Sequence, residues 1–380
     1  MTGHMTPLQQ LFDQGQSPWL DNISRALLRD GTFQALLDQG IVGMTSNPSI
    51  FQKAIGGGDA YDDELQRLAR AGTSAAAIYD DLVLDDIRAA AALLRPVYER
   101  TGGRDGYVSI EVAPALADDT ERTLREARRL FSYLNLPNVM IKIPGTPAGI
   151  PAIRQAIVDG INVNVTLLFA VTNYRAVAAA YLAGLEERAA AGWSIGGIAS
   201  VASFFVSRVD TAVDKRLDAL IGAATGARKE ELGGLKGTAA VANAVVAYAA
   251  FREIFSGPRW AALAARGARA QRPLWASTSM KDPARRDVRY VEELIGPDTV
   301  DTMPDATIAA VLDHGVVRRT LDADVAGARA TLERLARAGI DLGEVTDALQ
   351  RDGVAQFAAA FDDLNRTIAA KRAEMVAPAR

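Results

Sequence analysis

The stretch "NVMIKIPG" at residues 138–145 decides the fold, because it has the pattern of a short buried strand that ends in a Pro-Gly turn. Side chains alternate between the two faces of a strand. One face of this stretch therefore carries only branched aliphatic residues, and the other carries Met140 and Lys142. A charge held away from water without a partner costs several kcal/mol, so the lysine needs either a partner or a chemical role.

Two other stretches repeat this pattern and place further polar groups near Lys142. In "YVSIEV" (107–112) the polar face carries Glu111, and in "INVNVT" (161–166) it carries Asn164 and Thr166. Helices cover the outside of a parallel sheet, so a polar face cannot simply be turned towards water. We therefore expect these polar faces to point into the enclosed side of the sheet, where they satisfy one another or hold a ligand.

The whole chain alternates strand-like and helical segments, which favours parallel strands joined by helical crossovers. Eight strands in one chain predict an α/β fold of the closed (β/α)₈ TIM-barrel type. An open doubly wound sheet is the alternative, but no glycine-rich dinucleotide loop follows the first strand. The eight expected strands lie at 17–24, 40–46, 107–112, 139–144, 161–168, 198–205, 273–278 and 298–304.

We expect residues 1–380 to form a single barrel domain, with helical insertions near 55–105 and 215–270 and a helical C-terminal extension at 305–372. The sequence leaves open whether the first insertion caps the pocket or only thickens the barrel. The Ala-rich helix near 238–250 could belong to the core or to an interface, so a homo-oligomer is possible. The expected helices lie at 62–99 (two helices), 119–134, 148–158, 171–191, 207–220, 238–254 and 284–295, and from 305 onwards.

Composition narrows the class of protein. The formal net charge is −4 and no basic block occurs, so we expect no nucleic-acid partner. No run of about 18 apolar residues and no signal-peptide core is present, which predicts a cytoplasmic protein without a membrane span. Cysteine is absent, and the two histidines are His4 and His314. We therefore expect no metal site.

A lysine in a poorly solvated pocket can act as a free amine and attack a carbonyl to form a Schiff base. Such chemistry needs a carboxylate nearby to move protons. Glu111 and Asp21 are the candidates, since each lies near the end of an expected strand. Asp21, in "WLDNIS", could equally be the N-cap of the following helix. For Lys142 alone, a structural ion pair would be the simpler interpretation, but the polar groups at matching depth favour chemistry.

Six motifs in order along most of the chain resemble the transaldolase family, in its longer bacterial form. The resemblance implies a (β/α)₈ class I aldolase of the pentose phosphate pathway that forms a Schiff base and uses no cofactor. The motifs are "GMTSNPSIFQKAI" (43–55), "VSIEVAPALADDT" (108–120), "NVMIKIPGT" (138–146), "GINVNVTLLF" (160–169), "SVASFFVSRVD" (200–210) and "PLWASTSMKDP" (273–283).

The resemblance also implies roles for individual residues. Lys142 would be the Schiff-base lysine, and Asp21 would exchange the proton of the substrate hydroxyl. Glu111 would act through a water molecule held together with Thr166. Four polar side chains would surround the dihydroxyacetone unit, with Asn47 and Asn164 hydrogen-bonded to it and Thr45 and Ser203 in the same pocket.

The substrate phosphate would be held by Arg208 and Ser277. Shorter relatives often carry an arginine shortly after the matching serine, and here we assign the second cation to Lys281 in "STSMKDP". Related fructose 6-phosphate aldolases carry glutamine and tyrosine where this chain has Glu111 and Phe205, which favours a transferase. The substrates implied are sedoheptulose 7-phosphate or fructose 6-phosphate as ketose, with glyceraldehyde 3-phosphate or erythrose 4-phosphate as aldose. The alternatives are a fructose 6-phosphate aldolase-like enzyme and a catalytically silent sugar-phosphate-binding barrel.

Overall fold

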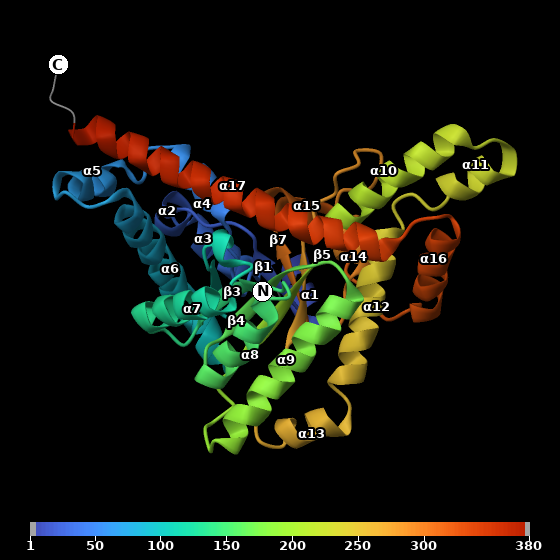
Figure 1. The fold of residues 1–380 in the computed structure, drawn as a ribbon, viewed down its shortest axis with the longest axis horizontal. Coiled ribbons are helices and arrows are strands. Elements are labelled where there is room, and N and C mark those ends of the chain that lie inside the picture. Colours follow the sequence, from blue (N-terminus) through green and yellow to red (C-terminus); the bar gives the residue numbers. More distant parts are fainter. Residues whose placement is uncertain (1–4, 377–380) are drawn as a thin grey trace.

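The computed structural model describes residues 5–376, so His4 lies outside the described residues. Its centre is a curled sheet of seven parallel strands in the order β1-β7-β6-β5-β4-β3-β2, with helices around it (Figure 1). All residues of these strands are buried. The strands are β1 (Gln16–Leu20), β2 (Val108–Glu111), β3 (Val139–Pro144), β4 (Val163–Leu168), β5 (Ser200–Phe205), β6 (Arg272–Ala276) and β7 (Thr299–Met303).

The expected strand at 40–46 is wrong as a regular strand, since only an isolated bridge forms there. Met44 bridges Leu20 on one side and Val108 on the other, both in parallel. The Leu20 amide donates to the Gly43 carbonyl at 2.9 Å. A Cβ atom at Gly43 would lie 2.4 Å from the Trp19 ring, so the chain passes too close to the indole for a side chain at this position. These residues therefore join β1 to β2 without forming an extended strand.

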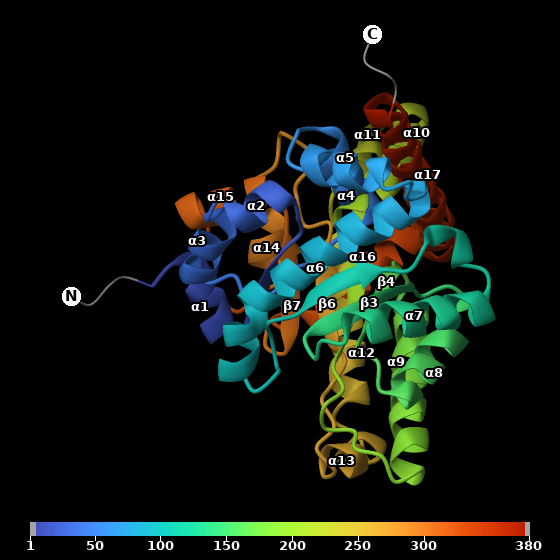
Figure 2. The ribbon, with the colours of Figure 1, turned by 90° about the vertical axis from the view of Figure 1, so that its left-hand side faces the viewer.

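Most expected helices are present, and the segment 62–99 is indeed two helices (Figure 2). The segment 284–295 is wrong in extent, since only five of its residues are helical. Several short helices were not expected. The helices are α1 (Pro7–Asp13), α2 (Arg25–Arg29), α3 (Thr32–Gln39), α4 (Pro48–Gly56), α5 (Asp62–Arg70), α6 (Ala75–Arg100), η1 (Pro114–Leu116), α7 (Thr120–Leu134), α8 (Gly149–Asp159), α9 (Val171–Ala190), α10 (Ser207–Ala223), α11 (Gly226–Gly233), α12 (Ala239–Ile254), α13 (Pro258–Ala264), α14 (Arg289–Glu293), α15 (Asp305–His314), α16 (Val325–Arg337) and α17 (Leu342–Val376).

The Ala-rich helix α12 belongs to the core. It packs against β6, α9, α10 and α16, and most of its residues are buried. Small side chains allow this close approach, and the polar Asn243 is satisfied by donating to the Phe169 carbonyl at 2.7 Å. Within residues 5–376, no single helix is long and apolar enough to cross a membrane, and the pair α12 and α13 meets that criterion only jointly, across a bend of 68°.

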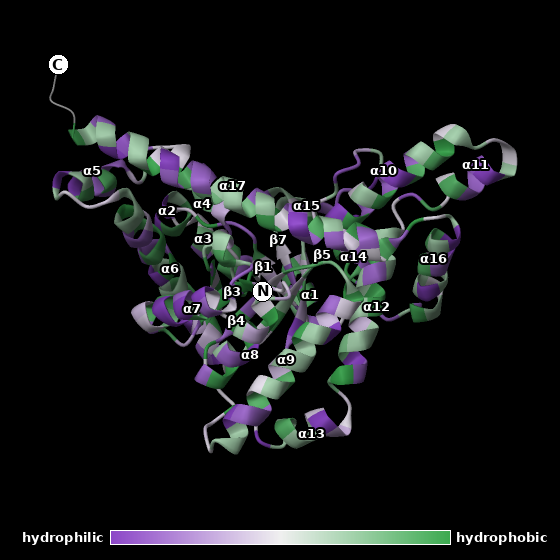
Figure 3. Cartoon of the chain, in the orientation of Figure 1, coloured by the Kyte–Doolittle hydropathy of each residue, from purple (hydrophilic) through white to green (hydrophobic). Residues whose placement is uncertain are grey.

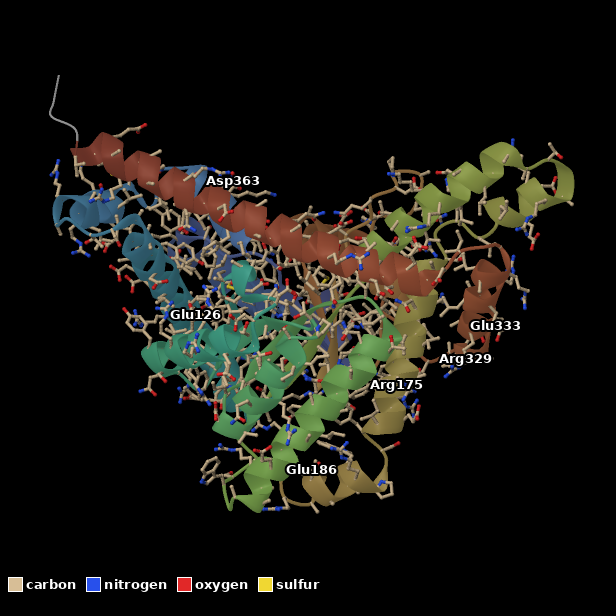
Figure 4. The ribbon with its side chains drawn as sticks, in the orientation of Figure 1. Glu126, Arg175, Glu186, Arg329, Glu333 and Asp363 are labelled. Carbon is tan, nitrogen blue, oxygen red and sulfur yellow. The ribbon has the colours of Figure 1, made fainter. Side chains whose placement is uncertain are left out.

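Hydrophilic and hydrophobic residues intermix along α6, α9 and α17 (Figure 3). Figure 4 labels charged side chains on α7, α9, α16 and α17. Some of these charges join helices, as in the Arg259–Glu186 pair at 2.6 Å and the Arg175–Glu253 pair at 2.5 Å. Exposed pairs of this kind contribute little to stability individually, so the fold depends chiefly on the buried apolar core.

Candidate active site

A cavity of about 350 Å³ lies at the carboxyl ends of the strands, which is where barrel enzymes build their active sites. The α17 helix crosses this end of the molecule (Figure 1). Ten of the twelve residues predicted for the site line the cavity. These are Asp21, Thr45, Asn47, Lys142, Thr166, Ser203, Phe205, Arg208, Ser277 and Lys281.

Lys142 points inward from β3, as the alternation along the strand predicts. Its neighbours in register are Glu111 on β2 and Asn164 on β4, so three polar side chains share one level of the enclosed face. The Lys142 side chain is only 6% exposed, and its Nζ lies 3.3 Å from Glu111 Oε2. Nζ also donates to the Ser46 carbonyl at 3.2 Å. The amine is thus held in a dry site beside a carboxylate.

Glu111 does not line the main cavity. It borders a second cavity of about 410 Å³ between α6, α7 and α17. Neither carboxylate oxygen has a hydrogen-bond partner among the described residues, and the buried Thr166 hydroxyl has none either. Burial raises the pKa of Glu111, whereas the nearby Lys142 charge opposes this shift. A carboxylate of this kind can change its protonation at a higher pH than an exposed glutamate.

Asp21 follows directly after β1 and faces the same cavity. Its Oδ1 accepts a hydrogen bond from the Thr45 hydroxyl at 2.7 Å. Burial raises the pKa of Asp21, and the charge of Lys142 opposes the shift. The N-cap of α2 is Ser24, whose hydroxyl oxygen accepts from the Leu27 amide at 3.2 Å. Asp21 is therefore not a helix cap, and its carboxylate is free to face the cavity.

The side chains of both predicted asparagines already form hydrogen bonds within the protein. Asn164 is fully buried outside the cavity lining, where it donates to the Ser109 hydroxyl at 3.0 Å and accepts from Ser203 Oγ at 2.7 Å. Asn47 caps α4, since its Oδ1 accepts from the Ile50 amide at 3.0 Å. Asn47 lines the cavity, whereas Asn164 reaches it through Ser203.

A cationic end of the cavity is formed by the predicted phosphate residues. The Arg208 guanidinium lies 5.4 Å from the ring centroid of Phe205 and forms no ion pair within residues 5–376; burial lowers its pKa. The Ser277 backbone has a left-handed φ of 59°, and its hydroxyl lies 2.8 Å from that of Ser207. Lys281 is exposed and donates to the Ser279 hydroxyl at 2.7 Å. This end of the cavity can accept an anion.

The chain is similar to proteins of one known family. The family described as Transaldolase/Fructose-6-phosphate aldolase matches residues 18–368. The chain is 52% identical to "Transaldolase 1" of Streptomyces coelicolor over 94% of this chain and 92% of that protein. It is 51% identical to a transaldolase of Thermobifida fusca (94% and 96%) and 47% identical to "Transaldolase 2" of Nostoc sp. (96% and 97%).

The chain belongs to the transaldolase/fructose-6-phosphate aldolase family. For this family member the structure also answers how the insertion at 55–105 relates to the site. No residue of that range lines the main cavity, and α6 instead packs on β2 while α5 packs on α17. Residues 55–105 therefore thicken the layer of helices on the sheet and support the helix that crosses the carboxyl ends of its strands.

Several residues that border the site were not predicted from the sequence, among them Thr302, Ser46, Lys53 and Phe357. Thr302 lies 2.7 Å from the Thr45 hydroxyl, and its position near the end of the expected strand at 298–304 was the available signal. Ser46 contributes a carbonyl oxygen, which no side-chain pattern reveals. Lys53 on α4 and Phe357 on α17 line the cavity, and their positions depend on tertiary packing alone.

Proposed function

We propose that the protein is a transaldolase, which transfers a dihydroxyacetone unit from a ketose phosphate to an aldose phosphate. The observation that carries the proposal is a lysine amine buried 3.3 Å from a carboxylate, in a cavity whose other end is cationic. Relatives at about 50% identity over most of the chain are named transaldolases. The expected substrates are sedoheptulose 7-phosphate or fructose 6-phosphate, with a shorter aldose phosphate as acceptor.

In the first half of the reaction, Lys142 Nζ attacks the C2 carbonyl of the ketose. Loss of water from the resulting adduct gives a protonated imine, which withdraws electrons from the adjacent bonds. Asp21 accepts the proton of the C4 hydroxyl as the C3–C4 bond breaks. The aldose phosphate leaves, and the electron pair of the broken bond remains on the enzyme as an enamine on Lys142.

In the second half, the enamine carbon attacks the aldehyde of an acceptor aldose phosphate, and Asp21 returns the proton to the new hydroxyl. Water then hydrolyses the imine and releases the new ketose. Proton transfer in the formation and hydrolysis of the imine is assigned to Glu111. The Glu111 oxygens and the Thr166 hydroxyl have no hydrogen-bond partner within residues 5–376, which supports the view that the two groups hold a water molecule between them.

Substrate binding is assigned to the remaining lining residues. Arg208, Ser277 and Lys281 would hold the phosphate, with Lys281 acting as a point charge rather than as a two-pronged partner. The dihydroxyacetone unit would lie among Thr45, Asn47, Asn164 and Ser203, with Asn164 acting in part through its bond to Ser203.

We favour a transferase over an aldolase that releases free dihydroxyacetone because this chain carries Glu111 and Phe205. Phe205 lies in an apolar contact, with its ring centroid 5.0 Å from that of Phe169, and it offers no hydroxyl to protonate the enamine. A related proposal concerns the fold: residues 42–45, bonded to both β1 and β2, take the place of the second strand of a (β/α)₈ barrel that forms one domain with its helical insertions.

The test is to trap the intermediate. Borohydride reduction in the presence of fructose 6-phosphate is expected to add one three-carbon unit to Lys142, detected by peptide mass spectrometry. Unmodified protein, or label on another lysine such as Lys53 or Lys281, would refute the assignment. Product analysis with and without an acceptor aldose then separates transferase from aldolase: a transaldolase turns over rapidly only when the acceptor is present.

A further inference from the structure

One side of the Lys142 amine is bordered by a residue from the far end of the chain. Phe357, on α17, is 5% exposed and lines the main cavity. Its ring centroid lies 5.5 Å from Lys142 Nζ. Glu111 and the Ser46 carbonyl contact Nζ as well, so Phe357 supplies an apolar boundary to a group that is otherwise polar.

The α17 helix is fixed above the ends of β3 and β4, which orients Phe357. The Gln350 side chain donates to the carbonyl of Gly145 at 3.2 Å and to that of Leu167 at 3.0 Å. Gly353 allows the close approach, because a Cβ atom there would lie 2.8 Å from a methyl carbon of Leu167. The helix is thus hydrogen-bonded to the residue that directly follows β3, the strand of Lys142, and to the neighbouring strand β4.

The C-terminal end of α17 is also fixed by side-chain contacts. Lys371 bonds to Asp62 at 2.7 Å, and Arg372 donates to the Thr73 carbonyl at 2.7 Å. Leu364 and Ile368 are fully buried, whereas Asp363 is exposed on the outer side of the helix (Figure 4). The helix is therefore fixed at both ends, and Phe357 lies between the two sets of contacts.

Two effects of the Phe357 ring can be compared by magnitude. An aromatic ring attracts a cation within about 6 Å of its centroid, and 5.5 Å is close to that limit, so the attraction is weak. As a wall, the ring removes conformations that a long lysine side chain would otherwise adopt and keeps water from that side of the amine. Misplacing a reacting group by about 1 Å can cost about 100-fold in rate, so the wall effect is the larger.

We propose that Phe357 is a positioning residue for Lys142. Its ring forms an apolar wall on the side of the lysine that faces α17, and this wall holds the amine towards Glu111 and the substrate carbonyl. This inference rests on the proposed function, since it concerns the same amine. It extends the site to the C-terminal helix α17. It also assigns Gln350 as the residue that fixes the position of α17, and with it the Phe357 ring, relative to the strands.

The test compares single-turnover trapping rates, with borohydride and saturating fructose 6-phosphate, among variants of the full chain. Phe357→Ala is expected to slow formation of the Lys142 adduct by about 10- to 100-fold and to lower kcat. The KM for the aldose phosphate should change by less than about 3-fold, because the predicted phosphate residues Arg208, on α10, and Ser277, directly after β6, belong to other elements. Phe357→Leu keeps an apolar wall and is expected to restore the rate to within about 3-fold of wild type. Gln350→Ala should fall between the two.

Phe361→Ala is the matched control, because Phe361 lies one turn further along the same helix. It borders the second cavity and packs on Tyr79 with ring centroids 5.2 Å apart. This variant is expected to lose thermal stability but to keep the wild-type trapping rate. Equal trapping rates for Phe357→Ala and wild type, equal slowing by Phe361→Ala, or failure of Phe357→Leu to restore the rate would each overturn the positioning role.

Failure of the proposed function gives a different result. If the wild-type protein forms no adduct on Lys142, the Schiff-base assignment is wrong. If the wild-type protein forms the adduct and the Phe357 variants form it at the same rate, only the inference about α17 is wrong.

Discussion

Two buried ion pairs point into the enclosed face of the same sheet, and they differ in how fully they are hydrogen-bonded. Towards the amino ends of the strands, Arg272 and Asp105 lie 2.9 Å apart. Asp105 also accepts from the Ser17 hydroxyl at 2.9 Å and from the Trp19 indole at 3.1 Å. Arg272 donates in addition to the Ser17 hydroxyl at 2.7 Å. The pair has the complete set of partners that a buried charge requires.

Towards the carboxyl ends, Lys142 and Glu111 lie 3.3 Å apart, and Glu111 has no hydrogen-bond partner within the described residues. Unsatisfied buried groups cost free energy, so this pair is held at the expense of stability. The comparison teaches that a charge on the enclosed face of the sheet does not by itself indicate catalysis. The incomplete bonding of the second pair, next to a cavity, is what distinguishes it from a structural ion pair.

Removing the lysine tests most strongly whether the second pair is catalytic. Lys142→Ala is expected to lower kcat by the order of 10⁶-fold, as in enzymes that lose a covalent nucleophile, because the change removes the amine that forms the imine in the proposed mechanism. Steady-state turnover and borohydride labelling measure this. Lys229→Ala, on the exposed helix α11, serves as control and should behave like wild type. Appreciable turnover by folded Lys142→Ala would show that the pair is merely structural.

Glu111→Gln keeps the shape of the second pair but removes its proton exchange. We expect a loss of about 10²- to 10⁴-fold in kcat, the usual contribution of general acid–base catalysis, with an adduct that forms and hydrolyses slowly. Because burial raises the pKa of Glu111 and the charged form is required, wild-type activity should fall on the acid side at a pH above the 4.3 or so of an exposed glutamate. A variant with wild-type turnover would remove Glu111 from the mechanism.

The corresponding change in the first pair should act on stability and leave catalysis intact. Asp105→Asn leaves Arg272 buried without a counter-charge, which costs about 3–5 kcal/mol. Urea unfolding measures the loss, and kcat of the folded variant should stay within about 3-fold of wild type. If kcat fell as far as in Glu111→Gln with little change in stability, the two pairs would not differ in the way that their hydrogen bonding indicates.

The contrast between the two pairs also shows what the sequence could predict. The alternation in "YVSIEV" and "VMIKIP" places Glu111 and Lys142 side by side once the strands are parallel, and the register is observed. The seven strands and the long helices were predictable for the same reason, because burial imposes a regular period. The segment at 40–46 was not, since its geometry depends on Gly43 lying against the Trp19 ring.

Contacts between distant parts of the chain lay beyond prediction. Phe357 is an ordinary apolar residue of an amphipathic helix, and nothing local indicates that it borders the amine. Asn47 and Asn164 were predicted as substrate ligands, but the sequence does not reveal that Asn47 caps a helix or that Asn164 is shielded by Ser203. Sequence motifs indicate which residues come together at the site. The hydrogen bonds that each of these side chains forms within the protein depend on the folded structure.

Asp301 extends the comparison, because it is a fully buried carboxyl that forms no ion pair within the described part of the chain. Its Oδ1 accepts from the Thr278 hydroxyl at 2.9 Å, and its Oδ2 has no partner within residues 5–376. Burial raises the pKa of Asp301 to about 7, against the opposing effect of the Thr278 bond. The folded state therefore holds this proton more tightly than the unfolded state does, and the resulting stability is lost as the pH rises through 7.

Asp301→Asn keeps the oxygen that Thr278 contacts but cannot ionise. From pH 5 to pH 8 the wild-type protein should lose about 3 kcal/mol relative to this variant, since about two pH units lie below the folded pKa and each is worth about 1.4 kcal/mol. Urea unfolding at the two pH values measures the difference, with Thr278→Val as a control that removes the opposing hydrogen bond and retains the titration. Parallel stability profiles for wild type and Asp301→Asn would mean that the carboxyl finds a partner in the folded protein, and that incomplete bonding does not set these buried groups apart.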